Sequence, residues 1–72
     1  MCQMRVIMET AAGPPEQIME DVTGLEVTPE GIVLATLFDE PHLIPGAAVK
    51  KIDFMATLVT LSLRGASHEP VN

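Results

Sequence analysis

The residue best suited to chemistry in this sequence is Cys2, the only cysteine among 72 residues. It directly follows Met1, and an initiator methionine is normally removed when the next residue is small. Removal would leave a free α-amine beside the thiol, and these two donors can close a five-membered chelate ring on a metal ion. A thiolate with a nitrogen donor can form a soft metal site or act as a reactive nucleophile.

A catalytic role for Cys2 would need a positioned base, an oxyanion hole and a substrate pocket. A chain of 72 residues leaves little material for a pocket. The sequence also has no glycine-rich phosphate loop, no CxxC or HExxH metal spacing and no GxSxG elbow. We therefore expect no enzyme, which leaves Cys2 as a metal ligand or as a small hydrophobic residue in the core.

As a ligand, Cys2 supplies a thiolate and an amine, with a backbone amide added if Met1 remains, and this set is incomplete for one ion. A two-fold homodimer would complete it with symmetric donors, because an isologous interface places identical residues near the axis. Square-planar nitrogen and sulfur coordination suits Ni(II) or Cu(II). Thioethers from Met1, Met4 and Met8 would suit Cu(I), although methionines commonly only fill a core.

Two histidines are further candidate ligands. His42 follows Asp39 and Glu40 closely enough for a loop site for a divalent cation, although such groups are often only solvated charges. His68 lies near the C-terminus, where we expect a polar tail.

The net charge of −6, from ten acidic and four basic residues, disfavours nucleic acid as a partner and favours cations. Lys50 and Lys51 are too few for a nucleic-acid patch. The longest apolar run, residues 32–38, is too short to span a membrane, and no signal peptide is visible. A single cysteine fits a reducing compartment, so we expect a cytoplasmic protein.

The elements that must position Cys2 are predicted to be strands, because period-2 alternation recurs and no segment keeps a period of 3.6. In the first strand Cys2, Met4, Val6 and Met8 share the inward face. The segment Thr10 to Pro15 should then break the pairing.

Further strands are predicted at residues 17–22, 25–28, 32–38, 48–54 and 58–63. Pro29 to Gly31 predicts a hairpin turn and Asp39 to Gly46 a long loop. In the last strand the odd positions should face the core. Residues 1–63 thus predict one small, closed or partly open β-barrel of five to six short antiparallel strands, and residues 64–72 a disordered tail. A chain this small without disulfides often gains stability by forming oligomers.

Several segments together resemble the CooT family over about residues 1–63. They are the Met1-Cys2 start, Glu20-Asp21-Val22 before Leu25-Glu26-Val27, Thr36 to Glu40 followed by His42 and Gly46, and Ile52-Asp53 in the closing hairpin. The Met-Cys start and the Leu-Phe-Asp-Glu stretch are the specific pieces, whereas the rest is general strand pattern. The stretch Gly13-Pro14-Pro15 and the C-terminal tail look longer than the family pattern.

The resemblance implies a small SH3-like β-barrel that forms a homodimer and binds Ni(II) at the dimer interface through Cys2. In that family the metal is delivered to a nickel enzyme, carbon monoxide dehydrogenase, during its maturation. The resemblance assigns no role to His42, His68 or the methionines. The alternative is a small β-barrel module for protein or RNA interaction without a metal role, although its only aromatic residues are Phe38 and Phe54.

Overall fold

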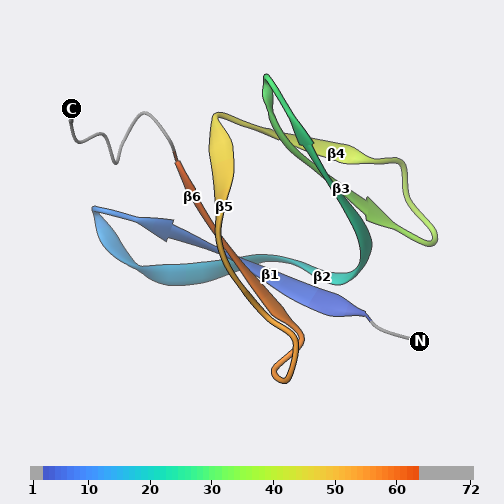
Figure 1. The fold of residues 1–72 in the computed structure, drawn as a ribbon, viewed down its shortest axis with the longest axis horizontal. Helices are drawn as coiled ribbons and strands as arrows, with labels where there is room; N and C mark the ends of the chain where they lie inside the picture. The colour runs from blue at the N-terminus through green and yellow to red at the C-terminus, as the bar shows by residue number, and fades with distance from the viewer. Residues whose placement is uncertain (1–2, 64–72) are drawn as a thin grey trace.

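The architecture is a single curled β-sheet, seen in a computed structural model that describes residues 3–63 (Figure 1). The described residues form six strands and no helix. The strands are β1 (Met4–Thr10), β2 (Gly13–Thr28), β3 (Gly31–Thr36), β4 (His42–Pro45), β5 (Ala47–Asp53) and β6 (Leu58–Leu63). Their order in the sheet is β4-β3-β2-β1-β6-β5. The all-β prediction is confirmed.

The sheet curls into a half-barrel, because β5 at one edge returns to contact β3 next to the other edge. This shape agrees with the predicted small SH3-like barrel. One pairing differs from the expected antiparallel arrangement: β1 and β6 run parallel, with Arg5 opposite Leu58 and Glu9 opposite Ser62. The crossing from β4 to β5 carries the chain to the far side of the sheet, so that β6 arrives beside β1 in the same direction.

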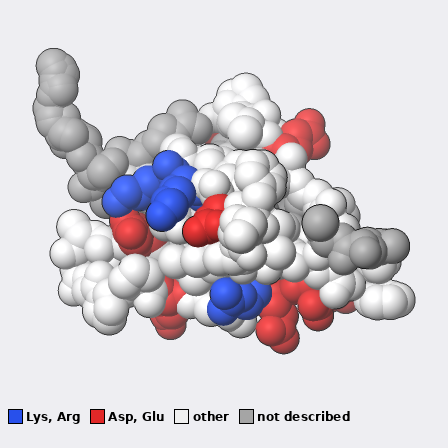
Figure 2. All heavy atoms as spheres, turned by 60° about the horizontal axis from the view of Figure 1, so that its bottom comes forward, with Lys and Arg blue, Asp and Glu red and all other residues white. Residues whose placement is uncertain are grey.

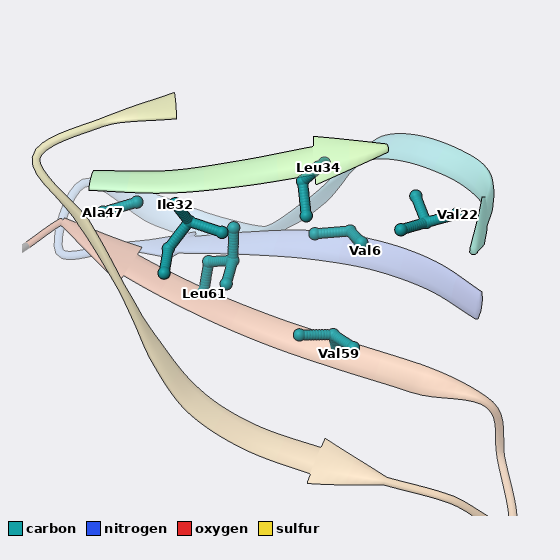
Figure 3. Packing of buried hydrophobic residues seen from close by; sticks show 7 residues of the cluster. All are labelled: Val6, Val22, Ile32, Leu34, Ala47, Val59 and Leu61. Atoms are coloured by element: carbon teal, nitrogen blue, oxygen red, sulfur yellow. The ribbon is translucent and has the colours of Figure 1, made fainter. Parts of the chain in front are cut away.

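The core lies on the inner face of the curl, as the alternation in β1 predicts. Val6 is fully buried, and Met4 and Met8 pack against the core from the same face of β1. Val59 and Leu61 of β6 belong to the core, as predicted for the odd positions of the last strand, although Thr60 between them is buried as well. The buried hydrophobic residues are Val6, Val22, Ile32, Leu34, Ala47, Val59 and Leu61 (Figure 3).

Two breaks predicted in the sequence, at residues 10–15 and near Gly24, do not interrupt β2. The turn after β1 is confined to residues 11–12, and Gly13, Pro14 and Pro15 already belong to β2. Prolines are tolerated there because β3 pairs with β2 only from Val22 onward, so this part of β2 has an unpaired edge that needs no N–H donor. The predicted break near Gly24 is a bulge within a continuous strand of 16 residues.

The segment predicted as a loop, Asp39 to Gly46, contains the short strand β4, which pairs with β3. Strand β3 ends at Thr36, so Leu37 and Phe38 lie outside it and are exposed. Prolines at both ends of β4 obscure it in the sequence, yet an edge strand accommodates them. The predicted tail, residues 64–72, lies outside the described residues, as do Met1 and Cys2.

The predicted turn at Pro29 to Gly31 is confirmed. Its backbone is hydrogen-bonded to the bend between β4 and β5. Thr28 Oγ1 accepts the N–H of Gly31 at 3.2 Å, and the Gly46 N–H donates to the Glu30 carbonyl at 2.9 Å. Gly31 has φ +153°, and a Cβ there would lie 2.2 Å from the carbonyl oxygen of Ile44. Only glycine therefore fits at this close approach of two backbones.

We predict that Gly31→Ala destabilises the fold by about 2 kcal/mol or more, because the methyl group meets a backbone that cannot yield easily. Urea unfolding followed by far-UV circular dichroism measures the effect. Gly13→Ala is the matched control, since a Cβ added at Gly13 meets nothing within 4 Å. Equal unfolding midpoints for the two variants would contradict the packing described for Gly31.

Candidate functional site

The start of β1 is held from both sides, and this is the part of the described structure that leads to Cys2. Met4 pairs with Val22 of β2, and Arg5 lies opposite Leu58 of β6. The Arg5 N–H donates to the carbonyl of Thr57 at 2.9 Å. The point from which the chain continues toward Cys2 is therefore fixed relative to β2 and β6.

The carbonyl that receives Arg5 belongs to the turn between β5 and β6. Thr57 has φ 52°, a left-handed conformation that is unfavourable for a β-branched residue. The turn is stabilised by the Asp53 carboxylate, whose Oδ1 accepts the N–H of Ala56 at 3.0 Å. A residue in a costly conformation at the position that contacts β1 marks this turn as a place where function can reside.

A groove of about 330 Å³ lies beside the start of β1. Residues from β1, β2, β5, β6 and the turn after β5 line it: Met4, Val22, Thr23, Gly24, Leu25, Ile52, Phe54 and Val59. None of them is charged. Two large apolar side chains of the adjoining turn are strongly exposed, Phe54 at 79% and Met55 at 97%. The surface next to the start of β1 is thus apolar and open.

The strand pattern of the sequence does not reveal this groove, since it places Phe54 in a strand and Met55 only in a turn. The one feature of the sequence that could have pointed to this surface is the composition of the turn between the last two strands. A turn carrying Phe and Met instead of Gly, Asn or Asp departs from ordinary turn composition.

Charged side chains form separate groups with uncharged surface between them (Figure 2). Within residues 3–63 no group of three His, Cys, Asp or Glu side chains could hold a metal ion. His42 is exposed on β4, and with Asp39 and Glu40 it does not form such a group. His68 lies outside the described residues. The loop site considered for His42 is therefore not present in the described part of the chain.

The remaining candidates have structural roles. Met4 lines the groove and Met8 packs against the core, so both serve packing. Lys50 forms an ion pair with Glu9 at the surface. No helix in residues 3–63 is long and apolar enough to cross a membrane.

Comparison with solved structures shows the same fold in the crystal structure of a protein described as a CooT candidate from Carboxydothermus hydrogenoformans. The TM-score is 0.73 at 23% sequence identity, and the match covers 85% of this chain and 95% of that chain. No curated protein matches the sequence.

The family comparison covers nearly the whole folded part. Residues 1–62 match the family described as CO dehydrogenase accessory protein CooT. The matched segment includes Cys2, all of β1 to β5 and most of β6. This match agrees with the resemblance based on the Met1-Cys2 start and the stretch before His42. The chain therefore belongs to the CooT family of CO dehydrogenase accessory proteins.

Proposed function

We propose that this protein is a nickel-binding accessory protein that holds Ni(II) through Cys2 at a homodimer interface and delivers it to a nickel enzyme such as CO dehydrogenase. Family membership supports the accessory role. The observation that carries the proposal is the fixed start of β1. Covalent geometry keeps the Cα of Cys2 within about 7 Å of the Cα of Met4. Because Met4 lines the apolar groove, Cys2 stays close to a surface suited to contact with another chain.

The donor chemistry supports nickel as the cargo. Each chain offers the Cys2 thiolate and an adjacent nitrogen from the main chain or terminus. Two chains together offer sulfur and nitrogen donors in pairs, which suits a square-planar Ni(II) ion. Copper is the minor alternative, since the same donors bind it.

The rest of the chain supports a cation over an anion as the cargo. The net charge of −6 raises the local concentration of cations around the protein. No competing group of three His, Cys, Asp or Glu side chains occurs in the described range. Nickel added to the protein would therefore meet few alternative ligands besides Cys2 and the histidines.

We predict that Cys2→Ser abolishes the sulfur-to-nickel charge-transfer absorbance and weakens Ni(II) affinity by more than about tenfold, or about 1.4 kcal/mol. A Ni(II) titration followed by ultraviolet absorbance measures both effects. His42→Ala is the matched control and should bind nickel as the parent does. If Cys2→Ser binds Ni(II) as tightly as the parent, the proposed ligand is wrong.

Nickel affinity should fall as the pH is lowered, because the thiol and the ammonium group bind metal only after losing a proton. For each proton released on binding, we expect about a tenfold loss of affinity per pH unit on the acid side. Competition with a chelator of known affinity, repeated at several pH values, gives the slope. An affinity independent of pH in the acid range would exclude a thiolate-amine site.

The stoichiometry should be one Ni(II) per two chains, because one chain supplies only part of the coordination sphere. Native mass spectrometry reports the dimer, the bound nickel and the state of Met1 in one spectrum. Saturation at one ion per chain would indicate private sites instead of a shared one.

A further inference from the structure

The loop between β3 and β4, residues 37–41, exposes an aromatic side chain in a part of the protein where small and polar residues are usual. Phe38 is 92% exposed, and Leu37 beside it is 58% exposed. The Asp39 N–H donates to Thr36 Oγ1 at 3.3 Å, so the loop is hydrogen-bonded to the end of β3. Aromatic side chains are enriched at protein–protein contacts and often anchor them. Phe38 therefore marks this loop as a contact surface.

The part of the chain that carries this loop is acidic throughout. Residues 6–49 contain no Lys or Arg. Their acidic residues are Glu9, Glu16, Glu20, Asp21, Glu26, Glu30, Asp39 and Glu40. The last two directly follow Phe38 and are exposed. Because like charges repel, such a surface disfavours nucleic acid, an anionic membrane and the same surface of a second copy, and it favours a protein surface that carries Lys and Arg.

The strand register places this loop near the start of β1. Thr36, the last residue of β3, lies opposite Val22 of β2, and Val22 lies opposite Met4 of β1. Because neighbouring strands lie about 4.8 Å apart, Thr36 is about 10 Å from Met4. The loop and the start of β1 also lie at the same end of the long axis of the molecule (Figure 1). A partner that binds Phe38 therefore comes close to the part of the chain that carries Cys2.

We propose that residues 37–41, hereafter the docking loop, bind the enzyme that accepts the nickel, with Phe38 entering an apolar pocket whose rim carries Lys and Arg. The enzyme as occupant rests on the proposed function, whereas the apolar anchor and the acidic surroundings are properties of the loop itself. Phe38 does not line the apolar groove, so docking leaves the groove open to other contacts. The acceptor is then held beside the nickel ligand, which shortens the path of transfer.

Biolayer interferometry with nickel-free CO dehydrogenase tests the docking loop. We expect Phe38→Ala to weaken binding at least about tenfold, because the variant loses the aromatic anchor. Its circular dichroism spectrum and Ni(II) affinity should match those of the parent, since Phe38 is exposed. Val27→Ala is the matched control: Val27 is 69% exposed on the same acidic part of the chain but lies opposite Ile32, at the other end of β3. It should bind the enzyme as the parent does.

The charge of the docking loop is tested with the double variant Asp39→Asn and Glu40→Gln. Added salt should weaken binding of the parent to the enzyme, because screening reduces the attraction between the acidic loop and a cationic rim. The double variant should bind more weakly than the parent at low salt and lose less affinity as salt is added. Affinities that do not change with salt in either protein would contradict a cationic rim.

Equal affinities of the parent and Phe38→Ala for the enzyme would overturn the docking loop, as would a parent that does not bind the enzyme. Native mass spectrometry of Phe38→Ala examines a second copy as the occupant. If this variant is monomeric where the parent is a dimer, the loop is a contact between copies, and docking of the enzyme there is wrong.

Failure of the docking loop can be told apart from failure of the proposed function. We expect Cys2→Ser to bind the enzyme as the parent does, although it carries no nickel. Enzyme binding that depends on Phe38, in a protein that binds no nickel, would support the docking loop and contradict the proposed function. Nickel binding through Cys2, with enzyme binding that ignores Phe38, would support the proposed function and overturn the docking loop.

Discussion

The curl of the sheet depends on a close approach of two backbones at Gly31. The turn between β2 and β3 lies directly against the bend between β4 and β5, with the Gly46 N–H bound to the Glu30 carbonyl at 2.9 Å. There is no room for a side chain at Gly31, where a Cβ would lie 2.2 Å from the Ile44 oxygen. From this corner the chain enters β5 at the fully buried Ala47 and crosses to the opposite edge of the sheet.

That crossing determines what surrounds the start of β1. Strand β5 leads into the turn whose Thr57 carbonyl binds Arg5, and β6 then runs parallel to β1. The same crossing brings Ile52 and Phe54 to a groove that Leu25 of β2 also lines. The steric constraint at Gly31 thus sets the path of β5, and through it the position of the turn and groove beside the start of β1.

Much of this architecture can be predicted from alternation alone. The inward positions of β1 and β6 follow from period 2, as the burial of Val6 and Leu61 shows. Predictions from local composition are wrong where the pairing of neighbouring strands decides the structure. Pro14 and Pro15 belong to a strand because that stretch has an unpaired edge. Strand β4 forms between two prolines because it pairs with β3.

The candidate site, too, is only partly predictable from the sequence. Cys2 is identifiable from its position and from the family resemblance, because a lone cysteine behind Met1 is visible in the sequence. The groove is not, since it joins residues from β1, β2, β5 and β6 that only the curl brings together. The left-handed conformation of Thr57 is likewise not predictable, because local propensity disfavours it for a β-branched residue.

The central claim is that nickel is bound by Cys2 residues of two chains. X-ray absorption spectroscopy at the nickel edge of the loaded protein tests it most directly, since the scattering shell counts sulfur neighbours. The account predicts a square-planar ion with sulfur ligands from both chains and nitrogen ligands completing the plane. A shell of oxygen and nitrogen alone, without sulfur, would contradict it.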